Sequence, residues 1–284
     1  MQIVETIESV RALVRAARED GSKIGLVPTM GALHVGHLSL IEAARQECDF
    51  VVVSIFVNPT QFGPGEDFDK YPRPLEADLE ICRKAGVNVV FAPTVEQMYG
   101  GENLTWVEVE KLTEPLCGRF RPGHFRGVAT VCAKLFNIVL PDAAYFGQKD
   151  AQQAVVIRRM VSDLKMPLRI VVCPTVREPD GMAVSSRNKY LTAQQRNDAA
   201  CIYKSLARCR QMIEAGVRDA EQITAEMRKI LEQVGSVEIE YVSLVDAETL
   251  EAAEHIGGRI MAAVAVRLDT ARLIDNIVVE VGAQ

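Results

Sequence analysis

The sequence has no apolar run of the roughly 18 residues that a membrane-spanning helix needs. Its first twenty residues carry acidic side chains throughout and no unbroken apolar stretch, which is not the pattern of a secretory signal peptide. Basic residues are fewer than acidic ones, 32 against 38, so the formal net charge is −6 and no global basic field favours nucleic acid. We therefore expect a cytoplasmic protein with neither a membrane nor a nucleic-acid partner.

Closely spaced pairs of cysteines are also missing. The number of cysteines is seven, which is odd, and no CxxC pair occurs, so the sequence argues against both a disulfide framework and a zinc site. Free cysteine is among the residue types most often found inside proteins. We expect reduced, mostly buried thiols at Cys48, Cys82, Cys117, Cys132, Cys173, Cys201 and Cys209.

The composition is that of a globular protein, with 48% hydrophobic and 25% charged residues over 284 positions. At about 100–200 residues per domain, this length predicts about two domains, although length alone also allows a one-domain barrel. Two prolines and a glycine interrupt the chain at residues 174–181, after an apolar run. We place a domain boundary there, between residues 1–175 and 176–284.

The first part alternates short β-branched runs with helical patterns, which is typical of parallel βαβ units. We expect strands near residues 24–27, 50–57, 87–91, 143–146 and 168–173, because these are nearly continuous apolar runs. Apolar residues at three- and four-residue spacing predict helices at 38–47, 75–84, 128–139 and 152–163. The fold class predicted for this part is α/β, a doubly wound, Rossmann-like parallel sheet.

The second part predicts a smaller α+β domain. Helical patterns cover about 193–214 and 220–233, and strand-like runs follow at 237–245, 259–268 and 271–279. In the first part, residues 58–74 form a long loop with four prolines and two glycines. Loops of that length in a compact domain are usually functional or disordered.

The segment with the clearest chemistry runs from residue 24 to 37, where a strand leads through a glycine-rich turn to a helix expected at about Leu38. Backbone N–H groups at a helix start, together with the helix dipole, form an anion site, and phosphate is the anion we expect. His34 and His37 lie three residues apart around Gly36, so both imidazoles can point toward one phosphate. Such an arrangement suits charge that develops during phosphate transfer.

Two other interpretations of the histidine pair stay open at this point. His34 and His37 could bind zinc, but the sequence has no HExxH glutamate and no cysteine nearby. They could also be purely structural residues. Against this, half of the four histidines of the chain fall in one glycine-flanked turn after an expected strand.

Six short segments, spread in order over nearly the whole chain, carry a resemblance. The HxGH turn resembles the nucleotidyltransferase superfamily, which includes class I aminoacyl-tRNA synthetases. Taken together, the segments look like the pantoate–β-alanine ligase (pantothenate synthetase) family: LVPTMGALHVGH (26–37), SIFVNPTQF (54–62), RPGHFRGV (121–128), YFGQKDAQQ (145–153), SSRNKYL (185–191) and ARLIDN (271–276).

The resemblance implies a two-step reaction and its substrates. In that family (R)-pantoate reacts with ATP to give an enzyme-bound pantoyl adenylate and pyrophosphate, and the amine of β-alanine then displaces AMP to give pantothenate. Such a site must hold two anions together, which calls for fixed positive groups and backbone donors. The family also implies Mg²⁺ as a cofactor of ATP and a homodimer joined through the first domain.

The catalytic residues that the resemblance implies are His37, which matches the family's proton donor, and His34, Lys149 and Arg187. Whether His37 transfers a proton or only stabilises charge stays open. Segment 185–187 corresponds to a loop that closes over ATP, and residues 176–284 would form a lid. The ATP-binding set is Met30, Gly31, Ala32, Leu33, His34, Val35, Gly36, His37, Gly147, Gln148, Lys149, Asp150, Val176, Val184, Ser185, Ser186 and Arg187.

The remaining site residues are also implied by the family. Gln61 and Gln153 match its pantoate-binding glutamines, and an amide can donate to and accept from hydroxyl groups. Gln61 is expected near β-alanine as well. Asp78 matches a carboxylate that holds Mg²⁺ with the ATP phosphates, although a solvated helix face is an alternative for it. Arg121 and His124 resemble residues near the active site, but their roles do not follow from the sequence.

Three rival functions share part of this pattern. A nucleotidyltransferase that releases a stable dinucleotide has HxGH but not the glutamine motifs or SSRNKYL. An enzyme that charges tRNA is disfavoured because the second part is short and the chain is acidic. A silent nucleotide-binding regulator would have lost its reacting groups, yet His37, Lys149 and Arg187 are present. Pyrophosphate release with pantoate and without β-alanine distinguishes these functions.

Overall fold

The computed structural model describes residues 1–269 and 271–282 of the chain. Its first part contains a parallel sheet in the spatial order β1-β4-β3-β2-β5-β6, which confirms the doubly wound α/β class. The strands are β1 (Gln2–Val4), β2 (Ile24–Thr29), β3 (Phe50–Ile55), β4 (Val89–Phe91), β5 (Ala143–Gly147) and β6 (Arg169–Cys173).

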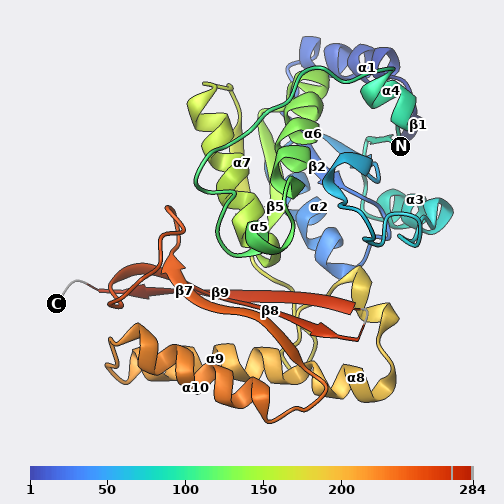
Figure 1. Ribbon diagram of the computed structural model, residues 1–284. Helices are drawn as coiled ribbons and strands as arrows, with labels where there is room; N and C mark the ends of the chain where they lie inside the picture. Colours follow the sequence, from blue (N-terminus) through green and yellow to red (C-terminus); the bar gives the residue numbers. More distant parts are fainter. Residues whose placement is uncertain (270, 283–284) are drawn as a thin grey trace.

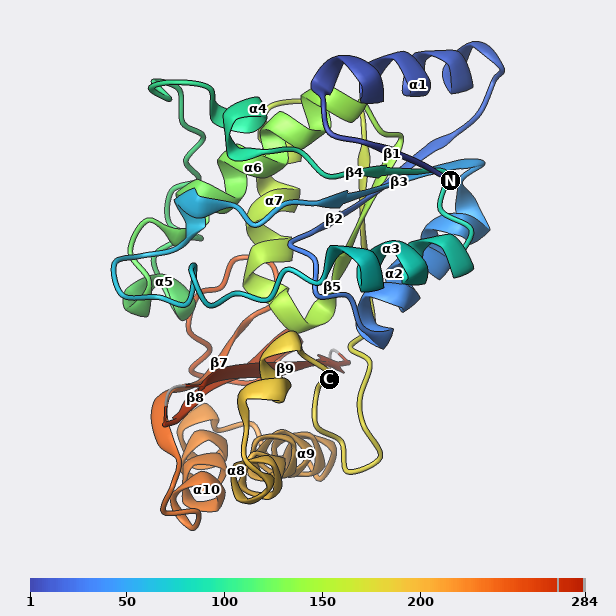
Figure 2. The ribbon, with the colours of Figure 1, turned by 90° about the vertical axis from the view of Figure 1, so that its right-hand side faces the viewer.

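Helices cover both faces of this sheet, because its side chains alternate between two apolar layers. Val52 of β3 belongs to the same buried cluster as helices α1, α6 and α7, whereas its neighbours Val51 and Val53 belong to the cluster of α2 and α3. Figure 2 shows the two helical layers on either side of the strands. The helices are α1 (Ile7–Glu19), α2 (Val35–Glu47), α3 (Leu75–Lys84), α4 (Val95–Tyr99), α5 (Cys117–Phe120), α6 (His124–Val139) and α7 (Ala151–Asp163).

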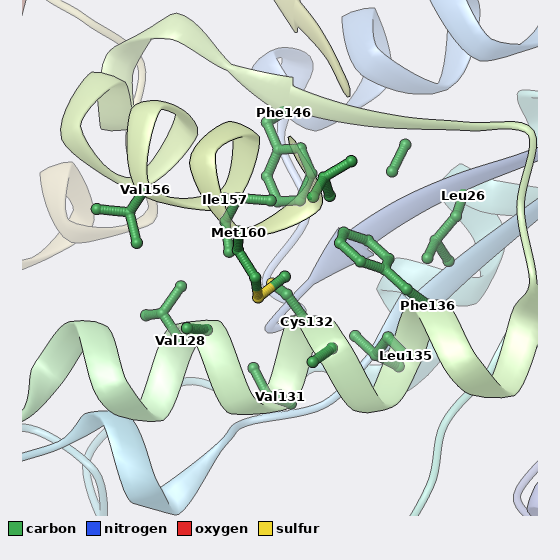
Figure 3. Packing of buried hydrophobic residues seen from close by; sticks show 14 of the residues in the cluster. Leu26, Val128, Val131, Cys132, Leu135, Phe136, Phe146, Val156, Ile157 and Met160 are labelled. Atoms are coloured by element: carbon green, nitrogen blue, oxygen red, sulfur yellow. The ribbon is translucent and has the colours of Figure 1, made fainter. Parts of the chain in front are cut away.

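Part of this core lies between α6, α7 and the sheet (Figure 3). Phe136 of α6 meets Phe146 of β5 edge to face, with ring centroids 6.5 Å apart, a favourable arrangement for aromatic pairs. Cys132 and Met160 fill the space between the two helices with adaptable sulfur-containing side chains. This packing fixes β5, from whose end the segment 147–150 emerges.

The sheet changes direction between β2 and β5. From β2 the chain moves outward through β3 to β4, and it then returns to β5 on the other side of β2 and continues to β6. In open α/β sheets, ligands bind beyond the carboxyl ends of the strands at such a switch point. The turns after β2 and β5, residues 30–34 and 148–150, both lie there.

The second part is a three-stranded antiparallel sheet, β7-β8-β9, with two long helices on one face (Figure 1). Its other face packs against the first part, since Val245, Met261 and Ala263 belong to the cluster of α6 and α7. The elements are α8 (Ala193–Asp198), α9 (Ala200–Glu214), α10 (Ala220–Glu232), β7 (Glu238–Asp246), β8 (Gly258–Leu268) and β9 (Ala271–Val281). This confirms the expected smaller α+β part.

The structure differs from the expected elements at several boundaries, and it contains four elements that were not expected in the first part, β1, α1, α4 and α5. Helix α2 begins at Val35 rather than at residue 38, and α6 begins at His124 rather than 128. The helix expected at 193–214 is divided into α8 and α9 at Ala199. The domain boundary that we propose lies in the connection between β6 and the 3₁₀ turn Ser186–Tyr190.

The seven cysteines are free and buried, as expected. Over the described part of the chain, no helix combines the length and the hydropathy that crossing a bilayer would require.

Candidate active site

A cavity of about 220 Å³ lies beyond the carboxyl ends of β2 and β5. It adjoins a larger cavity of about 940 Å³ between the two parts of the chain, and both are lined by Arg121, Lys149 and Arg187. The smaller cavity gathers these residues of the expected site: Met30, His34, Gly36, His37, Gln61, Gly147, Lys149, Asp150, Gln153, Val176, Val184, Ser185, Ser186 and Arg187.

The two histidines of the HxGH turn are oriented by the backbone of the turn itself. Nδ1 of His34 accepts the N–H of Gly36 at 3.1 Å, and Nδ1 of His37 accepts the N–H of His34 at 3.3 Å. Each neutral imidazole therefore carries its proton on Nε2, where it can be donated to a ligand. Gly36 is required here, because a Cβ would lie 2.9 Å from the His34 ring.

Burial keeps both imidazoles neutral. Burial, reinforced by the charge of Lys149, lowers the pKa of His34 from 6.5 to about 4. Burial, with His34 as the next contribution, lowers the pKa of His37 from 6.5 to about 3. Near neutral pH this structure thus presents two uncharged N–H donors rather than two imidazolium acids.

Asp78 of α3 holds the same turn through hydrogen bonds to its backbone. Its carboxylate accepts the N–H of Ala32 at 2.8 Å and the N–H of Leu33 at 2.7 Å, and the residue is 1% exposed. Burial raises the pKa of this carboxyl group, while the two backbone bonds act against that rise. Asp78 therefore holds the turn in shape, and it is neither a solvated residue nor part of the cavity lining.

Gln61 reaches the cavity from the 3₁₀ turn Pro59–Gln61. Its Oε1 accepts from Nδ2 of Asn58 at 3.2 Å, and its Nε2 lies 2.9 Å from the sulfur of Met30, which is a weak acceptor. Asn58 is held in turn by the hydroxyl of Tyr99, which donates to its Oδ1 at 2.7 Å. The amide of Gln61 is thereby fixed, and its N–H₂ group lacks a strong partner.

Arg121 and His124 hold the backbone of Gln61. Its carbonyl accepts from Nη2 of Arg121 at 3.1 Å and from Nδ1 of His124 at 2.7 Å. Burial, with Arg121 as the next contribution, lowers the pKa of His124 to about 4, so this imidazole is neutral as well. Arg121 also pairs with Glu66 of the long loop. The structure thus gives both residues a positioning role that the sequence did not reveal.

The side chains of the segment after β5 point in two directions, into the cavity and toward the second part of the chain. Lys149 and Asp150 line the cavity, with Nζ of Lys149 3.8 Å from Oδ1 of Asp150. The side chain of Gln148 points elsewhere and donates to Oδ1 of Asn276 at 2.9 Å. On α7, Gln153 lines the cavity, whereas Gln152 donates to the carbonyls of Leu112 and Pro115.

Segment 184–187 closes one side of the cavity. The N–H of Val184 donates to the carbonyl of Val176 at 3.0 Å, which brings these two expected ATP contacts together. Ser185 caps the following 3₁₀ turn, since its hydroxyl accepts the N–H of Arg187 at 3.3 Å. The guanidinium of Arg187 forms two hydrogen bonds with Asp67, at 3.1 and 3.2 Å. Arg187 therefore contacts the long loop in this structure.

Some expected contacts do not line the cavity. Asp78, Gly31, Ala32 and Leu33 lie in or under the turn, and Val35 is 56% exposed at the start of α2. No group of three or more histidine, cysteine or acidic side chains among the described residues could hold a metal ion. Four residues that support the site were missed. Asn58 bonds Gln61, Asn276 bonds the turn after β5, and Arg177 and Asp275 bond Asn276. The motifs NPTQF and ARLIDN contained three of them, but only as part of the resemblance.

Comparison with known proteins gives one consistent result. The family model described as pantoate-beta-alanine ligase matches residues 2–278. The pantothenate synthetase of Moorella thermoacetica is 57% identical over 281 residues, covering 99% of each chain. That of Geobacter sulfurreducens is 52% identical over 278 residues, covering 98% of each chain.

Solved structures agree with the sequence comparison. The chain resembles the pantothenate synthetase of Thermus thermophilus with a TM-score of 0.93 and 46% identity, over 98% of this chain and 99% of that one. It also resembles the pantoate-beta-alanine ligase of Francisella tularensis, complexed with beta-gamma ATP and beta-alanine, with a TM-score of 0.81 and 36% identity over 98% and 97% of the two chains. This chain therefore belongs to the pantoate–β-alanine ligase family, whose members are enzymes of pantothenate synthesis.

Proposed function

We propose that this ligase condenses (R)-pantoate with β-alanine at the expense of ATP, through a pantoyl adenylate, and releases AMP and pyrophosphate. The observation that carries the proposal is the joint presence, around one cavity, of two oriented Nε2–H donors, a lysine and an arginine, and two glutamine amides. The relative from Francisella tularensis, described in complex with beta-gamma ATP and beta-alanine, supports it.

In the first step, a carboxylate oxygen of pantoate attacks the α-phosphorus of ATP, and the bond to pyrophosphate breaks. Negative charge grows on the phosphate oxygens as this happens, so fixed donors lower the barrier. His34 and His37 supply Nε2–H groups, the start of α2 supplies its dipole, and Lys149 supplies a charge. The low pKa of His37 supports hydrogen-bond donation rather than full proton transfer as its contribution.

In the second step, the amine of β-alanine attacks the acyl carbon and AMP leaves. Gln61 and Gln153 would hold the hydroxyl and carboxyl groups of pantoate, and Gln61 would also lie beside β-alanine. The N–H₂ group of Gln61 faces the weakly accepting sulfur of Met30, which supports this assignment, because a buried donor without a strong partner gains most from binding one.

We assign closure over ATP to segment 185–187 and to the second part of the chain, in which this segment lies. Arg187 offers a planar fork of donors that suits phosphate oxygens. To bind them, the guanidinium would exchange its contact with Asp67 for the nucleotide. Residues 176–284 would then act as a lid that protects the mixed anhydride from water.

Asp78 is the residue at which a fit to Mg²⁺ can be judged. Both of its oxygens already accept backbone N–H groups, and the side chain is almost fully buried, so the structure does not favour a direct metal contact there. Mg²⁺ is commonly held by substrate phosphates, water and few carboxylates. We therefore assign no reaction step to a protein-held metal, and the metal role of Asp78 stays a prediction.

Two further expectations remain proposals. Seven free, buried thiols support work in a reducing compartment such as the cytosol. The homodimer implied by the family rests on the resemblance alone.

Isotope exchange tests the proposed function. The protein incubated with ATP, pantoate and labelled pyrophosphate, but without β-alanine, should move label into ATP, because adenylate formation is reversible. Omission of pantoate is the control and should abolish the exchange. Exchange that needs β-alanine, or that proceeds without pantoate, would contradict the adenylate pathway.

A further inference from the structure

Asn276 of β9 contacts the candidate ATP-binding turn from the second part of the chain. Its Nδ2 donates to the carbonyl of Gln148 at 3.0 Å and to the carbonyl of Lys149 at 2.9 Å. Its Oδ1 accepts from Nε2 of Gln148 at 2.9 Å. In Figure 1 the second sheet lies directly below the ends of β5 and α7 that this turn connects.

These contacts hold the peptide groups on both sides of one residue. The carbonyl of Gln148 precedes the Cα atom of Lys149 and the carbonyl of Lys149 follows it. With both anchored by one amide, the backbone of Lys149 is fixed while its side chain, 21% exposed, extends into the cavity. Asn276 therefore fixes the backbone position from which the side chain of Lys149 extends into the cavity.

Asn276 is itself held rigidly. Its N–H donates to Oδ1 of Asp275 at 2.8 Å, and its carbonyl accepts from Nη2 of Arg177 at 3.1 Å. Arg177 pairs with the buried carboxylate of Asp275 through two bonds of 2.6 and 3.0 Å, and it stacks on Tyr203 of α9 with 4.5 Å to the ring centroid. Asn276 is 5% exposed. An amide fixed to this degree can hold a turn with little freedom.

The chemistry of the contact requires an amide. Two carbonyl groups need a donor, and the N–H₂ group of Gln148 needs an acceptor, so both functions must come from one side chain. A carboxylate of the same shape would place lone pairs against both carbonyls and a second negative charge next to Asp275. Buried carbonyl and carboxylate oxygens that lack a hydrogen-bond donor are costly to the free energy of folding.

We infer that Asn276 is a positioning residue for the ATP half of the reaction: it sets the Gln148–Lys149 backbone so that Lys149 reaches the phosphates. The ATP site then requires the second sheet to be docked. This inference rests on the proposed function, because it assumes that Lys149 serves ATP.

Steady-state kinetics of Asn276→Ala and of the isosteric Asn276→Asp test the inference. The loss of buried hydrogen bonds to the turn should lower kcat/KM for ATP by roughly 5–150-fold, with KM for β-alanine changed less than about twofold. Asn276→Asp should be at least as impaired as Asn276→Ala. Gln148→Ala, which removes one of the three bonds, should have a smaller effect and keeps the test available if either Asn276 variant fails to fold.

Asn88→Ala is a matched control. Asn88 also bonds a backbone group, accepting the N–H of Val51 at 2.8 Å, but at the opposite end of the sheet. It should lower thermal stability without changing KM for ATP. If Asn88→Ala and Asn276→Ala change kcat/KM for ATP equally, Asn276 contributes only to the stability of the fold, and the inference is wrong.

A double-mutant cycle separates positioning from a merely structural role. In a Lys149→Ala background, adding Asn276→Ala should cause little further loss in kcat/KM for ATP, because the group that Asn276 places is already gone. Fully additive losses would overturn the inference while leaving the proposed function intact. If the unmodified protein forms no pantothenate, the proposed function fails instead, whatever the variants do.

Discussion

At the scale of single residues, the site depends on which nitrogen of each imidazole carries the proton. The backbone of the turn occupies Nδ1 of both His34 and His37, and burial removes the second proton. What faces the cavity is thus an uncharged Nε2–H on each ring. The sequence predicted the pair and its place in the fold, but it could not predict the tautomer, because that follows from contacts of 3.1–3.3 Å within the turn.

Replacing His37 should remove one donor of the transition state. His37→Ala is expected to lower the rate of adenylate formation by roughly 10²–10³-fold, as the loss of an oriented donor typically does. Rapid-quench measurement of pantoyl adenylate gives the rate, and the circular dichroism spectrum should be unchanged. His255→Ala, at an exposed position in the second part, is the control. Activity of His37→Ala within a few-fold of the unmodified protein would make His37 a structural residue.

The glutamines of α7 offer an internal comparison. Gln153 lines the cavity and Gln152 bonds the segment before α5, although they are adjacent in the chain. Gln61→Ala and Gln153→Ala should raise KM for pantoate by about 5–150-fold, with a smaller change for ATP. Gln152→Ala should lower the melting temperature and leave that KM nearly unchanged. If KM for both substrates rises equally in Gln61→Ala, its amide serves the architecture of the site instead.

At the scale of elements, the sequence predicted the buried strands well because each is a nearly continuous apolar run. Strand β1 escaped notice because it has three residues and pairs only with β4 at the edge of the sheet. The expected start of helix α2, residue 38, lies three residues after the observed start at Val35. The reason is that His34 caps the helix, and histidine is an unusual capping residue. Asp78 was assigned to Mg²⁺ because it matches a carboxylate of the family, and a sequence does not show the direction in which a helical carboxylate points.

Gly127 shows how an element can control the site without touching a substrate. Helix α6 approaches the turn of Gln61 so closely that a Cβ on Gly127 would lie 2.3 Å from the carbonyl oxygen of Thr60. Gly127→Ala should therefore displace Gln61 and raise KM for pantoate at least several-fold, as well as lower stability. Gly101→Ala, where a Cβ meets no atom within 4 Å, is the control. An unchanged KM for pantoate in Gly127→Ala would show that the turn does not need this close approach.

At the scale of the whole molecule, contacts that join distant segments are the part that the sequence could not supply. Asn276 meets the Gln148–Lys149 turn across about half the chain, and Arg177 meets Asp275 across 98 positions. No local pattern encodes such pairs. By contrast, the two turns that hold His37 and Lys149 could be predicted to meet, because each follows a strand of one parallel sheet and carboxyl ends share an edge.

The neutral histidines also make stability depend on pH. His34, His37 and His124 have pKa values lowered to about 4, about 3 and about 4, so between these values and 6.5 the unfolded chain binds more protons than the folded one. Stability should thus be full above about pH 6.5 and fall as the pH decreases toward 4. We expect a loss on the order of 1–2 kcal/mol for a well-enclosed histidine between pH 7 and pH 5.

Urea unfolding at pH 7 and pH 5 measures this dependence. His124→Gln should reduce the loss of stability on acidification, because one enclosed imidazole is removed. His255→Gln, which removes the exposed histidine, should leave the loss as it is. An identical pH dependence in the His124→Gln protein and the unmodified one would contradict the assignment of neutral, enclosed imidazoles.

The most direct test of the whole account follows oxygen through the reaction. If the carboxylate of pantoate attacks the α-phosphorus of ATP in the cavity beside His34 and His37, one carboxylate oxygen must leave with AMP when β-alanine attacks. Pantoate labelled with ¹⁸O in its carboxylate should therefore give AMP that carries one labelled oxygen and pantothenate that retains the other, as mass spectrometry would show. Label found in pyrophosphate or inorganic phosphate instead would mean that another phosphorus is attacked, and the pantoyl adenylate mechanism would be wrong for this protein.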